Sequence, residues 1–281
     1  MVWREDQTQT YKRHPWPLKI IDRVFLLVFL FGGLLLTWYE GFLIMPTYYS
    51  EVSFIVVVHI TVFVVLISHI YANLIFLVLT DTSVRCRTHL PLVSQTWRFC
   101  QDCNAHVPAR SHHCLNCNVC ILRHDHHCWF AGCCIGYRNQ RYFCVMLLYM
   151  FIMALYCNLF NYEFVCRLKG PLGFFNIISF TMPHVGWVLG YYDAYTFFVT
   201  TMSAIGFLLL LLFIWSLRNQ ARQILYGQTQ YEYKKKITCF DMGFKHNWTN
   251  VFGPHWFLAF FFPWIESKLP GDGFVFQMKN T

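Results

Sequence analysis

The chain has 281 residues and a formal net charge of +8, and 56% of its residues are hydrophobic while only 13% are charged. This composition is too apolar for an ordinary soluble protein and indicates a membrane protein. Nothing in it points to nucleic acid as a partner.

Four long apolar runs follow a polar, basic tail, Met1 to Lys19. The first run, Val24 to Ile44, is too long and too poorly ended for a cleaved signal peptide, so it predicts a membrane span. The others cover Val52 to Leu79, about Tyr142 to Phe164, and Tyr195 to Leu217. Each is near the ~20 residues that a helix needs to cross the hydrocarbon core. The expected fold is an all-α integral membrane protein with four transmembrane helices.

The Lys and Arg residues alternate in density along the chain. Five lie in the tail up to Arg23, none between the first two spans, seven from Arg85 to Arg141, two between the last spans, and eight after Leu217. The positive-inside rule then places both termini and the loop between the second and third spans in the cytosol. The segment Pro171 to Tyr192 is fairly apolar but contains prolines and glycines, and we interpret it as a luminal loop.

A few polar residues lie within the predicted spans: Glu40 in the first, and His59, His69 and Asn73 in the second. We expect them to face other helices. Polar contacts between helices explain them more simply than a substrate or proton path, although both interpretations fit the sequence.

Between the second and third spans, eight of the thirteen cysteines and six of the thirteen histidines lie within 35 residues. The pattern C-x2-C-x9-H-x6-C occurs twice there, shifted by 14 residues. Four Cys or His ligands suit a structural zinc ion, and disulfides are disfavoured in a reducing cytosol. We therefore predict two zinc sites: Cys100, Cys103, His113 and Cys120 for the first, and Cys114, Cys117, His127 and Cys134 for the second.

Cys128 falls outside both sets. A third copy of the repeat starting at Cys128 would need ligands at Ala131, Arg141 and Leu148, which do not bind zinc. With His126 two residues before it and Asp125 three before it, Cys128 is predicted to be an activated nucleophile, since an imidazole can take the thiol proton and a carboxylate can orient the imidazole. The alternative is a spare ligand, which is the preferred interpretation for Cys133.

This stretch resembles the DHHC cysteine-rich domain of membrane-bound protein S-acyltransferases, the palmitoyltransferases. The resemblance implies that Cys128 is the acylated nucleophile, His126 the base and Asp125 its orienter, and it implies the same two zinc sets. The chain departs from the family pattern in two places. Trp129-Phe130 replaces the usual Pro-Trp, and Cys133 replaces an Asn.

Two elements after the fourth span extend the resemblance. Gly227 to Glu232 is similar to the family's Gly-x-Thr-Thr-x-Glu element, with Gln230 in place of the second Thr, and Asn247 lies in a segment similar to its C-terminal aromatic motif. The aromatic block Trp256 to Trp264 is too short to span a bilayer and is predicted to be interfacial.

The resemblance implies transfer of a long-chain acyl (palmitoyl) group from acyl-CoA to cysteines of membrane-associated or membrane-embedded proteins. The reaction would pass through an acyl-enzyme. The predicted acyl-CoA contacts are Phe130, Arg123 and Lys235, although a run such as Lys234 to Lys236 is more often a solvated face. The expected location is a membrane of the endomembrane system: Golgi, endoplasmic reticulum or plasma membrane.

The predicted domains are a cytosolic tail (1–19), two transmembrane helices (20–79), a zinc-binding domain (80–141), two further transmembrane helices with the luminal loop (142–217), and a cytosolic C-terminal region (218–281). The main alternative is a catalytically weak or inactive membrane adaptor that keeps the zinc fold to bind partners. A membrane-anchored ubiquitin ligase is disfavoured because its zinc domain has a different ligand order.

Overall fold

The structure is a computed structural model that describes residues 19–49, 51, 53–84, 97–170, 173 and 180–279. Almost all of the predicted tail, residues 85–96 of the predicted zinc domain, and most of the first part of the predicted luminal loop lie outside the described residues. The chain forms two units. The cysteine-rich unit comprises the described parts of Met1–Leu27, Tyr71–Val145 and Asn219–Thr281, and the helical unit those of Val28–Ile70 and Met146–Arg218.

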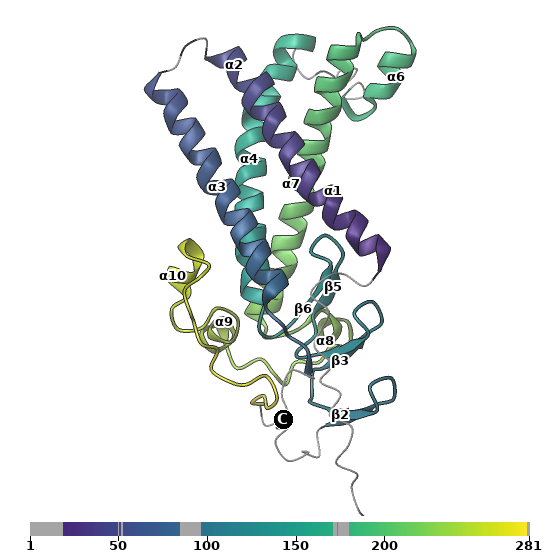
Figure 1. Ribbon diagram of the computed structural model, residues 1–281, viewed down its shortest axis with the longest axis vertical. Helices are drawn as coiled ribbons and strands as arrows, with labels where there is room; N and C mark the ends of the chain where they lie inside the picture. The colour runs from purple at the N-terminus through teal and green to yellow at the C-terminus, as the bar shows by residue number, and fades with distance from the viewer. Residues whose placement is uncertain are drawn as a thin grey trace, which may run out of the picture. The chain divides into compact units, whose positions relative to one another are not determined.

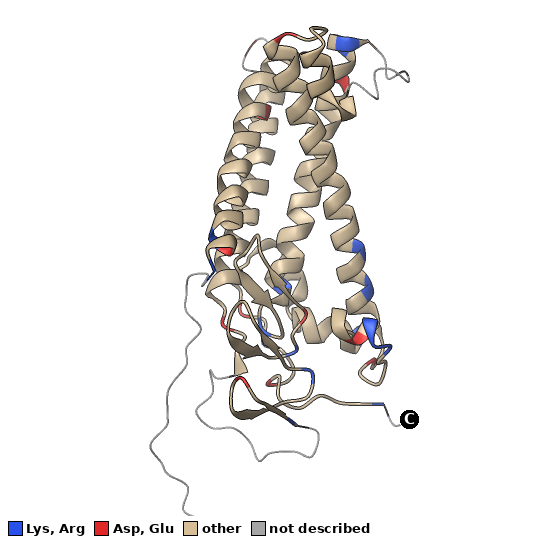
Figure 2. Cartoon of the chain, turned by 90° about the vertical axis from the view of Figure 1, so that its right-hand side faces the viewer, with Lys and Arg blue, Asp and Glu red and all other residues tan. Residues whose placement is uncertain are grey.

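Among the described residues, four helical segments are long and apolar enough to cross a membrane: Ile20–Tyr48, Phe54–Leu79, Gln140–Lys169 and Ala194–Leu225. They have 26 to 32 residues, more than the ~20 that the hydrocarbon core requires. Figure 2 shows almost no charged residues along their middles. A helix suits lipid because it satisfies its own backbone N–H and C=O groups. The predicted four spans, with the cysteine-rich stretch between the second and third, are confirmed.

The first segment is irregular and the last is longer than predicted. α1 (Ile20–Trp38) passes into a π-helical turn, η1 (Tyr39–Ile44), and then α2 (Met45–Tyr48), which contains Pro46. A proline clashes with the preceding helical turn, and the wider π turn accommodates it. α7 (Ala194–Leu225) continues past Leu217, where the apolar run ends, because the following Arg, Gln, Ala and Leu residues are good helix formers.

In the helical unit, polar side chains join neighbouring helices as expected. His59 of α3 (Phe54–Leu79) forms a hydrogen bond with Tyr156 of α4 (Gln140–Lys169), and Asn161 of α4 donates one to Glu40. The ring of His69 in α3 stacks on that of Tyr149 in α4, with centroids 4.4 Å apart. Within the predicted luminal loop the structure describes a short helix, α6 (Pro183–Val188).

The described residues of the cysteine-rich unit form three antiparallel hairpins, labelled in part in Figure 1. They pair strands of three residues each: β1 (Arg98–Cys100) with β2 (Ala105–Val107), β3 (His112–Cys114) with β4 (Val119–Ile121), and β5 (His126–Cys128) with β6 (Cys133–Ile135). These short strands also pack on a small hydrophobic core, which includes Trp97, Val107, Leu122, Tyr137 and Phe274.

The C-terminal region adds α8 (Gln230–Lys234), α9 (Phe244–Phe252) and α10 (Trp256–Phe261) to this unit. The side-chain amide of Asn247 is buried and donates to the carbonyl of Leu225 at 3.0 Å and to Asp241 at 2.7 Å. Gly227 has φ +60°, and a Cβ there would lie 2.6 Å from Oδ1 of Asn247. The two elements that carried the resemblance after the fourth span therefore meet at one contact, which requires a glycine.

Candidate active site and metal centres

The two predicted ligand sets come together in space. In each set the four ligand atoms lie within 4.8 Å of one another. In the second set, Sγ of Cys117 lies 3.6 Å from Sγ of Cys134 and 3.4 Å from Nδ1 of His127. A tetrahedral zinc ion with Zn–S bonds of about 2.3 Å needs ligand atoms separated by about 3.5 to 3.8 Å. The donors, their number and their spacing therefore fit two structural zinc ions.

The hairpins explain why the ligand pattern repeats every 14 residues. His113 lies opposite Cys120 in the second hairpin, and His127 lies opposite Cys134 in the third. Each of these cross-strand pairs supplies one His and one Cys. The remaining two ligands of each site are the Cys pair in or beside the turn of the preceding hairpin. Each zinc ion would therefore link two consecutive hairpins, and the interleaved spacing is a consequence of this linkage.

Asp22, at the start of α1, contacts the second zinc set and was missed in the sequence analysis. Nδ1 of His127 faces the cysteines, while its Nε2 is 3.2 Å from Oδ1 of Asp22, which is 1% exposed. A carboxylate that accepts the second N–H of a ligating histidine fixes the ring orientation and its tautomer. The only sequence signal was an acid at the start of an apolar run.

Asp22→Ala is expected to lower the affinity of the second zinc site by about 10- to 100-fold, because the ring of His127 loses its orienting partner. Zinc transfer to a chelator of known affinity measures this in the purified protein. Glu266→Ala, which removes an exposed acid from the same unit, is the control. Equal zinc retention in both variants would contradict a role for Asp22.

Strand geometry separates the predicted nucleophile from the zinc ligand beside it. Successive side chains of a strand point to opposite faces, so His126 and Cys128 of β5 share one face and His127 occupies the other. His126 forms a hydrogen bond with Cys128, and its Nδ1 lies 2.8 Å from Oδ2 of Asp125. The three residues predicted to act together are therefore connected in the order Asp125, His126, Cys128.

The carboxylate of Asp125 is held from two further directions. Gln220, in the part of α7 beyond the predicted span, donates its side-chain amide to Oδ2 at 3.0 Å, and the backbone N–H of Gln230 donates to Oδ1 at 2.8 Å. The contact at Gln230 uses the backbone, so the replacement of the family's Thr by Gln does not remove it. Gln220 was missed because the predicted span ended at Leu217.

These contacts set the charges of the pair. Burial opposes ionisation of Asp125, but the hydrogen bond and charge of His126 and the donors from Gln230 and Gln220 outweigh it and lower the pKa of Asp125. Burial likewise opposes the imidazolium form of His126, yet hydrogen bonds to Asp125 and Cys128 raise its pKa to about 10. At neutral pH the pair is therefore a carboxylate and an imidazolium.

This pair predicts a pH-dependent stability. The folded protein holds the proton of His126 more tightly than the unfolded chain, so the stabilisation is fully present below about pH 6.5 and is lost as the pH rises toward 10. We expect the melting temperature of wild type to exceed that of His126→Gln at pH 6.5, with the difference shrinking toward pH 10. A difference that stays constant over this range would contradict the assigned pair.

The loop that follows Cys128 begins with two aromatic residues, Trp129 and Phe130. The ring of Phe25 in α1 stacks on Trp129 and meets Phe130 edge-on, with both centroid distances 5.5 Å. Phe130 is half-exposed at 44%. On the other side, Phe143 in the first turn of α4 packs edge-on against His126 at 5.2 Å. Aromatic side chains from the starts of two helices therefore contact residues just before and just after Cys128 in the sequence.

A buried ion pair fixes the segment that carries Gln230. Arg110 binds both carboxylate oxygens of Glu232, at 2.6 and 2.7 Å, and the carbonyl of Gly227 at 2.8 Å. Glu232 also completes a capping box with Thr229, which begins α8. This role of Arg110 was not predicted from the sequence.

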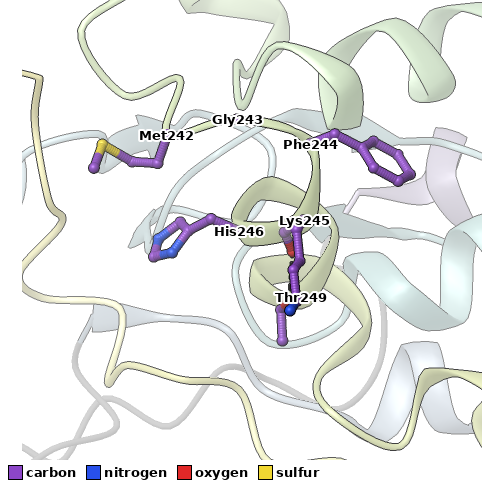
Figure 3. A pocket seen from close by; sticks show the side chains of 6 residues that line it. All are labelled: Met242, Gly243, Phe244, Lys245, His246 and Thr249. Atoms are coloured by element: carbon purple, nitrogen blue, oxygen red, sulfur yellow. Dashed lines mark hydrogen bonds between the residues drawn. The ribbon is translucent and has the colours of Figure 1, made fainter.

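The predicted acyl-CoA contacts are in different environments. Phe130 and Lys235 are exposed, whereas Arg123 is 3% exposed and its guanidinium donates to the carbonyl of Asn250 at 3.3 Å. A phosphate could reach Arg123 only after the residues that cover it moved. A pocket of about 460 Å³ lies at the start of α9 and is lined by none of the predicted site residues. Figure 3 shows the side chains that line it, including His246 and Phe244.

The fold and site define a class of protein: a multi-pass membrane protein with two sets of four Cys and His side chains that fit metal ions, and an Asp-His-Cys arrangement on the hairpin that carries part of the second set. A family model described as DHHC palmitoyltransferase matches residues 93–237, and the chain belongs to this family.

Three relatives show how far the similarity extends. The chain is 36% identical over 190 residues to the probable palmitoyltransferase ZDHHC24 of Danio rerio, covering 66% of this chain and 63% of the relative. The Mus musculus protein of the same name is 33% identical over 192 residues, covering 66% of each. The palmitoyltransferase ZDHHC22 of Danio rerio is 28% identical over 240 residues, covering 78% of this chain and 81% of the relative.

Proposed function

We propose that this protein is a protein S-acyltransferase that moves a long-chain acyl group, such as palmitoyl, from acyl-CoA to cysteines of other proteins. The arrangement of Asp125, His126 and Cys128 supports this proposal most directly. Membership of the family supports the same reaction. The zinc ions would cross-link the hairpins, since four protein ligands leave no position for a substrate.

The reaction would proceed in two steps. Cys128 would act as a thiolate beside the imidazolium of His126, and its sulfur would attack the thioester carbonyl of acyl-CoA. The coenzyme thiolate would leave and take up the proton held on His126. In the second step the now neutral His126 would take the proton of a thiol of the substrate protein, and the resulting thiolate would attack the acyl-enzyme, so that the Cys128 thiolate and the imidazolium are both restored. Asp125 would accept a hydrogen bond from Nδ1–H of His126. The other ring nitrogen, Nε2, would then exchange protons with the sulfur atoms.

We place the cysteine-rich unit in the cytosol of an endomembrane compartment or at the plasma membrane. The dense Lys and Arg residues of the segments on this side support the orientation. The start of α1, the end of α3, the start of α4 and the end of α7 all belong to this unit, as expected for helices that cross alternately in opposite directions. Its substrates would be membrane-associated or membrane-embedded proteins with cytosolic cysteines.

Labelling in cells with a clickable fatty acid tests the proposed function. We expect wild type to carry hydroxylamine-sensitive label and to increase the labelling of other membrane proteins, and we expect Cys128→Ser to do neither. Cys166→Ser, which changes a cysteine of α4 in the helical unit, is the control. Equal labelling by wild type and Cys128→Ser would contradict the assignment of the nucleophile.

The exposed aromatic loop predicts an effect on chain length. We propose that Phe130 borders the entrance for the acyl chain, where a larger indole ring would crowd it. Overpacking typically costs about 1 to 3 kcal/mol, so Phe130→Trp is expected to shift the preference toward shorter chains. Autoacylation with a series of saturated acyl-CoAs measures this. An unchanged length profile with both zinc ions bound would show that Phe130 does not border the chain.

A further inference from the structure

A second cysteine lies directly opposite the proposed nucleophile. In the third hairpin Cys128 of β5 pairs with Cys133 of β6, and the neighbouring pair is His127 with Cys134. That neighbouring pair supplies two ligands of the second zinc set, which shows that paired residues point to the same face. Cys128 and Cys133 therefore share the opposite face, away from the zinc set.

Their direct pairing in the hairpin suits a disulfide. Directly opposed residues of an antiparallel pair have Cα atoms about 4.5 to 5.5 Å apart, and disulfides usually join Cα atoms about 4.4 to 6.8 Å apart. The loop that connects the strands is closed by a hydrogen bond from Gly132 N–H to the carbonyl of Trp129 at 3.0 Å. Neither cysteine belongs to a ligand set, so joining them would not require either zinc ion to leave.

We propose that Cys133 is a resolving cysteine, which forms a reversible disulfide with Cys128 when a peroxide oxidises the nucleophile. This inference rests on the proposed function, which makes Cys128 the reactive thiol. Peroxide would transfer one oxygen to the Cys128 thiolate, giving a sulfenic acid and hydroxide. The sulfur of Cys133 would then attack the sulfenic sulfur, the S–S bond would form as the S–O bond breaks, and water would leave with the Cys133 proton. The two thiols lose the two electrons that the peroxide gains.

Burial favours a disulfide over acyl transfer between the two sulfurs. Cys133 is 0% exposed, and its neighbour Cys134 is held in the zinc set. A long acyl chain on Cys133 would need space that a close-packed hairpin does not provide. A disulfide adds no atoms. Cys133 would thus protect the nucleophile from further oxidation to sulfinic acid, which thiols do not reverse.

The test uses the full-length protein with zinc bound, in detergent. After brief treatment with hydrogen peroxide and alkylation of the remaining thiols, peptide mass spectrometry without reduction should find a peptide with Cys128 and Cys133 joined, about 2 Da lighter than the dithiol form. Autoacylation should be lost and then recovered with dithiothreitol. In Cys133→Ser, autoacylation before oxidation should be unchanged, but recovery should be about tenfold lower because Cys128 proceeds to sulfinic acid.

Each other outcome has a defined meaning. A disulfide between zinc ligands, or a Cys128 that becomes equally hyperoxidised in wild type and Cys133→Ser, would overturn the inference. If Cys133→Ser loses zinc, the variant is no longer informative. The inference then stands or falls on whether mass spectrometry finds the Cys128–Cys133 disulfide in wild type. Mass identification does not depend on acyl transfer. Normal autoacylation without the disulfide would therefore reject the resolving cysteine, whereas the disulfide without any autoacylation would reject the proposed function.

Discussion

Replacing His126 with alanine is expected to lower the rate of Cys128 acylation by about 10²- to 10⁴-fold, the usual contribution of a positioned acid or base. Both zinc ions should remain bound, because His126 lies on the face of β5 opposite the zinc ligand His127. Autoacylation with palmitoyl-CoA and elemental analysis of the same sample measure the two effects. His106→Ala, an exposed histidine of β2, is the control for surface changes.

Loss of zinc together with activity in His126→Ala would contradict this account. In that case His126 would be needed for the fold of the hairpin, and its loss would say nothing about chemistry. Full autoacylation activity in His126→Ala would also contradict this account, because it would show that Cys128 ionises without the imidazole.

Removing zinc is expected to unfold the hairpins. Zinc binding supplies on the order of 10 kcal/mol per ion in small zinc modules, and the small core around Trp97 and Phe274 cannot replace two such contributions in strands of three residues. Wild type should contain two zinc ions per chain. His113→Ala and His127→Ala should each lose zinc and become sensitive to limited proteolysis between β1 and β6.

Elemental analysis and proteolysis of the three histidine variants together test the division of roles. The variants His113→Ala and His127→Ala should lose zinc, whereas His126→Ala should retain both zinc ions. A single zinc ion per well-folded wild-type chain, or equal zinc loss in all three variants, would contradict the two ligand sets.

The two ligand sets, and the exclusion of Cys128 from them, could be predicted from the sequence because their geometry is local. Each His–Cys pair closes one hairpin and each Cys pair lies in or next to one turn, so a fixed spacing along the chain corresponds to a fixed arrangement in space. The alternation of side chains in β5 likewise separates Cys128 from His127 without any distant contact. The apolar runs predicted the four spans for a similar reason, since the length of a helix follows from the thickness of the bilayer.

The residues that support the site could not be predicted because they come from distant parts of the chain. Gln220 contacts a residue 95 positions away, Asp22 one that is 105 away, and Arg110 one that is 122 away. Each depends on where a helix or loop ends, and periodicity defines those ends poorly. Gln230 shows a further limit, because its contact with Asp125 uses the backbone and is independent of the side chain.

The central claim is that Cys128 carries the acyl group during the reaction. The most direct test is mass spectrometry of purified, zinc-loaded protein after brief exposure to palmitoyl-CoA, followed by addition of a peptide with a single cysteine. We predict a palmitoyl group on Cys128, removable by hydroxylamine, that disappears as the peptide becomes acylated. A palmitoyl group only on other cysteines, or an acylated peptide formed equally by Cys128→Ser, would contradict the account.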